Sequence, residues 1–558
     1  MLYPKMNCRR DVYSLNGVWN YAFVEETYEP TAARTHCKPM AVPASFNDIQ
    51  TDMEIREYSG KVLYEREFAV PQRDDRIYRL RIGAASHKCD VYLNGEKIGS
   101  GINGFYPVDL PLNNLKENNR LSVVIDNRLT AQTFPNGRIM NGKQETRHDF
   151  YNYTGIHRDV LVYTLPKKHI EDIVIRTVVD GDYSKVSVDV QGEWNDITYR
   201  VLDEEGKEVV RTKENVFTIA NPVRWEALNA YLYTLIVETD ADKYEEKFGI
   251  RKVEVKGNQF LLNDKPVYFK GFGLHEDFFV LGKGNNPAVT LRNFECMKWV
   301  NANSFRTSHY PYSEEVLDLA DRYGYLVIDE APAVGMVLWK ECFGENGAND
   351  ESLAIHKELM KQLYERDKNH PCVVMVSVSN EPQSTEAGSE AYFKEVFAHT
   401  RKFWELPVTV VEPSLANADN TYVSQFADVV CVNRYLGWYT DHGNLSVIEE
   451  QLTRDLNNFH NKYHKPVILS EFGADTMEGL HALPAVTYSE DFQTLYLAEN
   501  CKTLDKLDFC IGEHVWNFAD FQTKQGPDRI RGNRKGVFTK ERQPKMAAYF
   551  LKERWKNK

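Results

Sequence analysis

Val374-Met-Val-Ser-Val-Ser-Asn-Glu-Pro382 and Pro466-Val-Ile-Leu-Ser-Glu-Phe-Gly473 are the two stretches that decide the fold of this chain. Each is a short apolar run that carries a glutamate near its end, Glu381 or Glu471, and that a loop-forming proline or glycine closes. Buried parallel strands that end in this way are typical of the C-terminal mouth of a β/α barrel, where the active sites of such barrels lie. The two stretches therefore predict a barrel with two carboxyl groups at its mouth.

The sequence from residue 253 to residue 558 repeats this pattern of apolar runs. Helical stretches separate most of the runs, and Ser313 and Gly324 are placed to begin and end the first helix. Eight runs in alternation with helices predict a (β/α)8 TIM barrel. The runs are Val267–Lys270, Ala302–Arg306, Tyr325–Asp329, Val373–Ser377, Val408–Val411, Val429–Asn433, Val467–Ser470 and Cys510–Trp516. The predicted helices are Ser313–Tyr323, Glu351–Lys368, Ser389–Trp404, Val447–Tyr463 and Ser489–Leu507.

The sequence before the barrel is rich in strands and divides into two units. Residues 1–165 alternate apolar and polar positions in Lys61–Val70 and Arg76–Ile82, and Asn94-Gly95 is a strong hairpin signal. This unit predicts a jelly-roll β-sandwich. Residues 166–252 contain several short strands with Asp-Gly and Glu-Gly turns, which predict a small immunoglobulin-like β-sandwich. The whole chain is therefore expected to be a multidomain β plus α/β protein.

Composition excludes several classes of protein. The net charge of −13 disfavours a nucleic-acid partner, which would require a basic face. No apolar run is long enough to span a membrane, and Met1–Arg10 lacks the apolar core of a secretory signal, so no membrane partner is expected. The nine cysteines are an odd number without CxxC spacing, which indicates reduced thiols and a cytoplasmic location. Without HExxH, paired-Cys, clustered-Asp or GxGxxG signatures, we expect no metal and no cofactor.

Two carboxyl groups at one barrel mouth are the groups that glycoside hydrolysis needs. Glu381 ends the fourth run and Glu471 the seventh, so the two lie on opposite sides of the ring and can approach the roughly 5–5.5 Å separation of retaining enzymes. One carboxyl would protonate the leaving oxygen while the other attacks the anomeric carbon. The alternative is a pair of structural carboxylates in ion pairs. Asn380 is either a donor to a sugar 2-hydroxyl or a turn residue.

The Asn380-Glu-Pro and Ser470-Glu-Phe-Gly strings, together with the order of the three units, resemble glycoside hydrolase family 2. The resemblance covers essentially the whole chain. It implies that Glu381 is the general acid/base and Glu471 the nucleophile. The acid needs a raised pKa whereas the nucleophile must stay ionised, so the two environments must differ.

A sharper resemblance is to the β-glucuronidases of that family. It rests on the strings His148–His157, Gly273–Asp277, Arg306–Pro311, Cys431–Tyr439, Val515–Phe521 and Arg529–Gly536. It implies that Tyr435 orients the nucleophile, that Trp516 offers its ring face to the sugar, and that His275 and Asn433 line the floor. His309 is a further candidate. Packing aromatic residues and a buried structural histidine are the alternative interpretation.

The resemblance also implies a grip on a sugar carboxylate. Asn533-x-Lys535 would hold the C6 carboxylate, with Tyr439 and Arg529 at the same end and Asp149, from the jelly roll, on the sugar hydroxyls. The chemistry agrees, because a lysine charge and an amide donor bind a carboxylate through charge-assisted hydrogen bonds. Four cations, at positions 529, 531, 534 and 535, cluster here in an acidic protein. The alternative is a solvated basic loop, with Asp149 paired to its neighbouring histidine.

The predicted function is that of a retaining β-D-glucuronidase acting on a small glucuronide or a glucuronic-acid-containing oligosaccharide. The alternatives are another family 2 glycosidase, such as a β-galacturonidase or β-galactosidase, and a non-catalytic carbohydrate-binding protein. The resemblance further suggests a homodimer or homotetramer. The stretch from Gly335 to Ile355 is short and irregular, which predicts an open mouth that accepts larger glucuronides or is completed by a neighbouring subunit.

Overall fold

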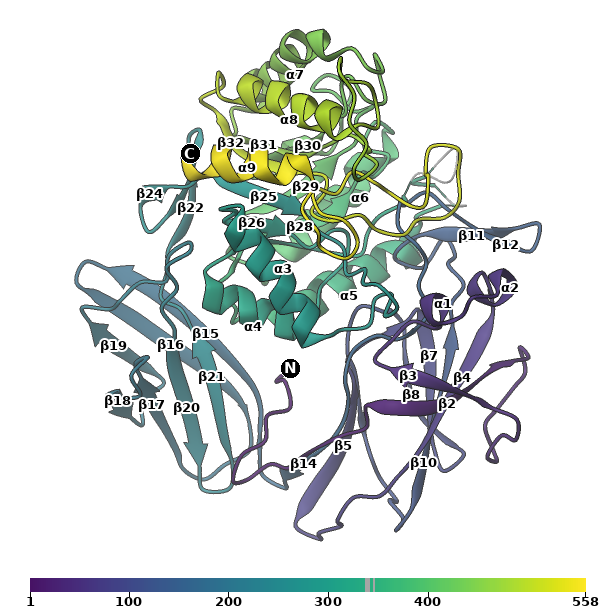
Figure 1. Cartoon of the computed structure of the whole chain (residues 1–558). Coiled ribbons are helices and arrows are strands. Elements are labelled where there is room, and N and C mark those ends of the chain that lie inside the picture. The colour runs from purple at the N-terminus through teal and green to yellow at the C-terminus, as the bar shows by residue number, and fades with distance from the viewer. Residues whose placement is uncertain (337–341, 345–346) are drawn as a thin grey trace.

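A computed structural model describes residues 1–336, 342–344 and 347–558 and folds them into two β-sandwiches and a closed barrel (Figure 1). In Figure 1 the barrel lies above the two sandwiches, and the N-terminus lies between them. Each of the eight predicted barrel runs overlaps a strand of the closed barrel. The predicted fold class is confirmed.

The jelly roll pairs a four-stranded sheet, β1-β14-β5-β9, with a six-stranded sheet, β3-β2-β4-β10-β7-β8. The Asn94-Gly95 hairpin joins β7 to β8 as predicted. The strands of the two sheets are β1 (Val12–Ser14), β2 (Gly17–Val24), β3 (Lys38–Val42), β4 (Lys61–Phe68), β5 (Arg76–Ile82), β7 (Lys88–Leu93), β8 (Glu96–Gly101), β9 (Val108–Pro111), β10 (Asn119–Asp126) and β14 (Val160–Pro166). Short elements complete the unit: α1 (Phe46–Ile49), α2 (Met53–Arg56), β6 (Ala85–Ser86), β11 (Gly137–Met140), β12 (Lys143–Thr146) and β13 (Gly155–Ile156).

The second sandwich packs sheet β15-β16-β19 against sheet β18-β17-β20-β21. A small antiparallel sheet, β22-β23-β24, then leads into the barrel. The strands are β15 (Ile170–Asp180), β16 (Tyr183–Gly192), β17 (Ile197–Leu202), β18 (Glu208–Thr212), β19 (Val216–Ala220), β20 (Tyr233–Thr239), β21 (Lys243–Phe248), β22 (Val253–Lys256), β23 (Gln259–Leu262) and β24 (Lys265–Pro266).

The barrel consists of eight parallel strands in chain order, and β32 pairs with β25 to close it. The strands are β25 (Phe269–Gly273), β26 (Ser304–Arg306), β27 (Leu326–Glu330), β28 (Val373–Asn380), β29 (Val408–Glu412), β30 (Val430–Asn433), β31 (Val467–Phe472) and β32 (Cys510–Val515). The helices are α3 (Pro287–Trp299), α4 (Glu314–Tyr323), α5 (Asp350–Asp367), α6 (Gly388–Thr400), η1 (Ser424–Phe426), η2 (Leu445–Val447), α7 (Ile448–Tyr463), α8 (Glu490–Leu504) and α9 (Met546–Lys556).

Several local features differ from the sequence prediction. Gly324 ends α4 in the left-handed conformation as predicted, but the Ser313 side chain makes no capping hydrogen bond. Helices α3 and α9 were not predicted, although Asn286 caps α3 and a proline begins it. The connection from β29 to β30 contains only η1. Its loop is held by Glu412, whose buried carboxylate accepts hydrogen bonds from the hydroxyls of Thr421 and Ser424.

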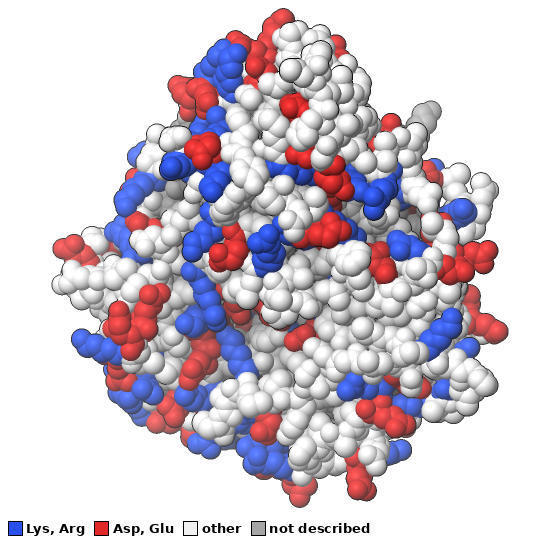
Figure 2. Space-filling model, viewed as in Figure 1, with Lys and Arg blue, Asp and Glu red and all other residues white. Residues whose placement is uncertain are grey.

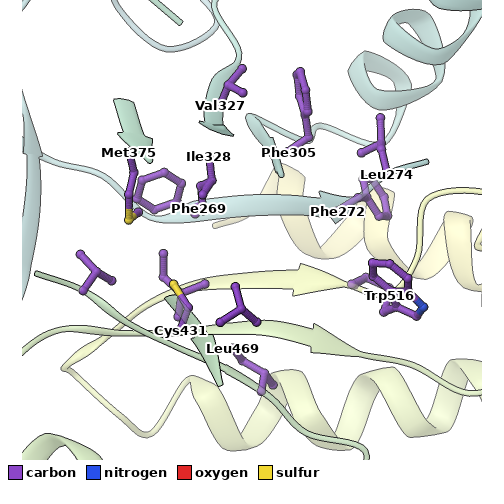
Figure 3. Close-up of a cluster of buried hydrophobic side chains, with 14 of the residues drawn as sticks. Phe269, Phe272, Leu274, Phe305, Val327, Ile328, Met375, Cys431, Leu469 and Trp516 are labelled. Carbon is purple, nitrogen blue, oxygen red and sulfur yellow. The ribbon is translucent and has the colours of Figure 1, made fainter. Parts of the chain in front are cut away.

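The barrel strands are packed on both faces. Phe269, Phe272 and Phe305 are fully buried, and Figure 3 shows them near residues from β27, β28, β30 and β31. Phe272 packs on Trp555 of α9 (ring centroids 5.1 Å apart) and Phe305 on Phe294 of α3 (6.0 Å). Layers of large side chains from alternating strands fill barrels of this kind, so the barrel is a rigid support and not a pore. The polar positions that matter for chemistry are therefore confined to the strand ends.

The structure also bears on the predictions about surface charge, cysteines and membrane-spanning segments. On the face shown in Figure 2, cationic and anionic side chains are interspersed. All nine cysteines are free thiols, and seven are buried. Among the described residues, no helix combines the length and apolar character needed to cross a membrane.

We predict that Trp225 locks the second sandwich to the barrel. Its side chain is fully buried and its Nε1 donates to the carbonyl oxygen of Asp321 in α4 (2.9 Å). Trp225→Ala should destabilise the chain by about 3–5 kcal/mol, because it leaves a large cavity at the junction. Thermal unfolding of the full chain measures the loss. Tyr183→Ala, at an exposed position of the same sandwich, is the control; equal changes in the two variants would contradict the prediction.

Candidate active site

A cavity of about 460 Å³ opens at the C-terminal ends of the barrel strands. Both predicted catalytic glutamates line it, and so does a segment of the jelly roll. The site is therefore built by two parts of the chain that are far apart in sequence. Residues that line the cavity include His148, Asp149, His309, Asn380, Glu381, Tyr435, Tyr439, Glu471, Trp516 and Arg529.

Glu381 follows the last residue of β28 and leaves the strand with a left-handed backbone (φ 47°). This conformation is unusual for a residue other than glycine and is typical of functional sites, where the surrounding structure enforces it. The backbone N–H of Glu381 donates to the carbonyl oxygen of Val411 (2.8 Å), and Asn433 Nδ2 donates to its carboxylate (2.9 Å). Burial and the nearby charge of Glu471 raise the pKa of Glu381 to about 7. Glu381 is thus suited to hold a proton at neutral pH.

Glu471 lies in β31 in a different environment. Its carboxylate forms an ion pair with the guanidinium of Arg306 and accepts a hydrogen bond from Tyr435 Oη (2.6 Å). Burial raises the pKa of Glu471, and the contacts with Arg306 and Tyr435 oppose that shift. The Glu381 carboxyl therefore has a neutral amide as its partner, whereas the Glu471 carboxyl has a guanidinium and a phenol. This difference is what separate acid and nucleophile roles require.

Irregular strand pairing aims these side chains. The register shifts between Ser377 and Asn380 in β28 and between Leu469 and Phe472 in β31. Bulges of this kind re-aim side chains next to active sites. The backbone is also close-packed here, because a Cβ at Gly473 would lie 1.7 Å from the carbonyl oxygen of Trp516. Glycine is therefore required two residues after Glu471.

The predicted floor residues fall into two layers. Trp516 lines the cavity and stacks on His309, with ring centroids 5.1 Å apart. His275 and Asn433 are not among the lining residues. His275 meets Trp516 edge-on (5.3 Å) and contacts Tyr310 Oη through Nδ1, whereas Asn433 reaches Glu381. Asn380 lines the cavity, and its Oδ1 accepts from Arg306 (3.3 Å).

The residues predicted to hold a sugar carboxylate also come together. Arg529 Nε and Asn533 Nδ2 both donate to the carboxylate of Asp149, each at 2.9 Å. Lys535 is fully buried and donates to Tyr439 Oη (2.8 Å). The jelly roll therefore reaches the barrel at this end of the cavity, and a ligand carboxylate would enter an existing network of charges.

Arg531 and Arg534, from the predicted cationic cluster, do not line the cavity. Arg534 pairs with Asp520 (3.1 Å), and Arg531 is exposed. The residues that sequence reasoning missed are Asp475, which forms an ion pair with Lys535, and Arg306. Asp475 lies four residues after Glu471, and Arg306 is the last residue of a predicted barrel strand. These positions at the barrel mouth are the sequence features that could have indicated both residues.

The stretch from Gly335 to Ile355 lies partly outside the described residues. Residues 337–341 and 345–346 are not described, and α5 begins at Asp350. The predicted open mouth therefore stays a prediction.

Among the described residues, one group of potential metal ligands lies away from the cavity. The ligand atoms of Asp321, His370 and Cys372 lie within 4.8 Å of one another. Asp321 already accepts from His370 Nδ1 (2.6 Å) and from the backbone N–H of Cys372 (2.9 Å). Burial lowers the pKa of His370, but the charge of Asp321 outweighs it and raises the pKa to about 10. A protonated histidine in an ion pair accounts for this group.

Comparisons with known proteins agree along the whole chain. Residues 253–558 match the glycosyl hydrolases family 2 TIM barrel domain, residues 12–166 its sugar binding domain, and residues 168–251 a further family 2 domain. The chain belongs to glycoside hydrolase family 2. It is a glycoside hydrolase, and the resemblance predicted from its motifs is confirmed.

Three full-length relatives of this family 2 chain carry the name β-glucuronidase. A β-glucuronidase of Paenibacillus borealis is 42% identical over 100% of this chain and 98% of its own length. Among solved structures, a β-glucuronidase of an uncultured Clostridium species has a TM-score of 0.97 and 43% identity, covering 100% of both chains. The β-D-glucuronidase of Dictyoglomus thermophilum has a TM-score of 0.95 and 44% identity, covering 100% of this chain and 99% of its own.

We predict that Tyr435 supports catalysis by this family 2 enzyme through its hydrogen bond to Glu471. A hydrogen bond to a charged group contributes about 1.5–3 kcal/mol, so Tyr435→Phe should lower kcat by about 10- to 100-fold. Steady-state kinetics on an aryl glycoside measures the effect. Tyr496→Phe is a matched control, because the Tyr496 hydroxyl is buried without a hydrogen-bond partner among the described residues; an equal loss there would contradict the role.

Proposed function

We propose that this chain is a retaining β-D-glucuronidase in which Glu471 is the nucleophile and Glu381 the general acid/base. The observation that carries the assignment of roles is the contrast between the two carboxyl groups in one cavity. Glu381 has a pKa raised to about 7 and an amide partner, and Glu471 is paired with Arg306 and Tyr435. The names and full-length similarity of the relatives support hydrolysis of β-glucuronides.

The reaction then has two steps. In the first, Glu471 attacks the anomeric carbon and forms a glucuronyl ester, while Glu381 gives its proton to the leaving oxygen. In the second, Glu381 removes a proton from water, which releases glucuronate with net retention. Asn380 is proposed to donate to the sugar 2-hydroxyl, a contact that strengthens in the transition state. Trp516 is proposed to face the sugar ring, with His275, His309 and Asn433 supporting this floor.

The carboxylate of the sugar is proposed to bind between Arg529, Asn533 and Lys535, with Tyr439 beside them. This position is supported by the charge-assisted contacts that these groups already make with Asp149 and one another. Asp149 is proposed to read the sugar hydroxyls from the jelly-roll side. A β-galacturonidase differs only in the C4 hydroxyl and stays the alternative.

The remaining assignments are proposals of the same kind. We propose domains at residues 1–165, 166–252 and 253–558, a small glucuronide or glucuronic-acid oligosaccharide as substrate, and a homodimer or homotetramer. Cytoplasmic location and the lack of nucleic-acid or membrane partners stay predictions from composition.

The decisive test compares kcat/KM for nitrophenyl β-D-glucuronide, β-D-galacturonide and β-D-galactoside. We expect the glucuronide to lead by several orders of magnitude. Lys535→Ala should lower glucuronide kcat/KM by about 10²- to 10³-fold, because a buried charge contact contributes about 2–5 kcal/mol, and should leave the neutral galactoside unaffected. Arg531→Ala, at an exposed cation of the same loop, is the control. Equal turnover of galactoside and glucuronide would contradict the substrate assignment.

The pH dependence follows from Glu381. Because its pKa is raised to about 7, the acid is protonated below neutrality and loses its proton as the pH rises, so kcat/KM should fall above about pH 7. Glu381→Gln should remove this basic limb. It should also slow substrates with poor leaving groups by about 10²- to 10⁴-fold while sparing dinitrophenyl glucuronide. A basic limb that persists in Glu381→Gln would show that another group is the acid.

A further inference from the structure

Arg306 carries a buried charge that two carboxylates share. Its side chain is fully buried; Nη2 pairs with Glu471, and Nη1 donates to Glu330 Oε1 (2.7 Å). Glu330 ends β27, is itself fully buried, and does not line the cavity. It therefore has no access to substrate, yet it lies one guanidinium away from the proposed nucleophile.

The contacts of Glu330 with a cation and with a hydroxyl donor favour its ionised form. Besides Arg306, it accepts a hydrogen bond from Ser377 Oγ (2.7 Å), and His309 Nδ1 lies 2.9 Å from its Oε1. The same ring nitrogen lies 3.1 Å from Arg306 Nη1, and burial lowers the pKa of His309. Burial raises the pKa of Glu330, and Arg306 and Ser377 oppose that shift. The titratable or charged groups facing Glu330 are Arg306, His309, Tyr312, Cys431 and Glu471.

The charge balance of this cluster changes during the proposed reaction. Before attack, Glu471 and Glu330 are anions and Arg306 is a cation, so the cluster carries one net negative charge. When a Glu471 oxygen bonds to the anomeric carbon and the glycosidic bond breaks, with the Glu381 proton passing to the leaving oxygen, Glu471 becomes a neutral ester. Arg306 then has Glu330 as its carboxylate partner, and the cluster is neutral. Without Glu330, the ester would leave a buried guanidinium without a counter-ion, which is strongly unfavourable.

We propose that Glu330 is a positioning residue that acts through Arg306 and favours formation of the glycosyl-enzyme. It keeps Arg306 paired after Glu471 has given up its charge. Before attack, its negative charge weakens the hold of Arg306 on Glu471, which keeps the nucleophile reactive. This role rests on the proposed double displacement and assigns a function to a residue outside the cavity.

The test separates the two half-reactions. A 2-deoxy-2-fluoro-β-glucuronyl fluoride forms the ester quickly and releases it slowly, so inactivation reports ester formation and reactivation reports hydrolysis. Glu330→Gln should lower the inactivation rate constant by about 10- to 100-fold and leave reactivation unchanged or faster, because only ester formation consumes the charge of Glu471. On the acid side of the pH profile, kcat/KM should fall as Glu471 becomes protonated. In Glu330→Gln this acid limb should move to lower pH, because removing a nearby anion lowers the pKa of Glu471.

Two further variants distinguish charge from packing. Glu330→Asp keeps the negative charge, so its acid limb should stay where it is in the unmodified chain. Ser377→Ala removes a hydrogen bond to Glu330 but leaves its charge in place. It should slow inactivation by about threefold and leave reactivation unchanged. This variant also provides the test if Glu330→Gln does not fold. Parallel loss of both rate constants, or an acid limb that does not move in Glu330→Gln, would overturn the proposal.

The substrate assignment can fail separately. If the unmodified chain reacts with the galacturonyl or galactosyl fluoride and not with the glucuronyl fluoride, the proposed substrate is wrong. The ratio of variant to unmodified rate constants on the reactive fluoride still decides the role of Glu330.

Discussion

The ion pair between Arg306 and Glu471 is the interaction on which the site depends. A carboxylate as buried as Glu471 would be protonated without a partner, and a protonated carboxyl is a poor nucleophile. Arg306 comes from β26 and Glu471 from β31, so closure of the barrel is what brings the cation to the anion. Both side chains are buried, and the low dielectric around a buried pair strengthens the attraction.

The same fold gives two identical side chains different chemistry. Glu381 directly follows β28, Glu471 lies near the end of β31, and both line one cavity. Of the two, Glu471 forms an ion pair with a guanidinium, whereas Glu381 accepts a hydrogen bond from the amide of Asn433. The negative charge of Glu471 also raises the pKa of Glu381. The environments, and not the residue types, separate the proposed proton donor from the proposed nucleophile.

The jelly roll is part of the site as well as a neighbour of the barrel. Asp149 reaches from the jelly roll to Arg529 and Asn533 in the loop after β32. An ion pair that crosses between two folded units fixes their relative position at the end of the cavity where a sugar carboxylate is proposed to bind. Trp225 makes a similar connection between the second sandwich and α4. The contact between the jelly roll and the barrel is therefore also part of the wall of the cavity.

The sequence by itself determined the three-part fold, because strand and helix periodicity and the loop signals after the two glutamate-bearing runs are local properties of the chain. It also pointed to Glu381, Glu471 and the Asn533-x-Lys535 string as candidate site residues, because each stands in a short motif that can be recognised in the sequence. It did not reveal the shared charge of Arg306, the pairing of Lys535 with Asp475, or the position of His275 behind Trp516. Only the tertiary structure decided these, because burial and charge partners depend on distances between segments that are far apart in sequence.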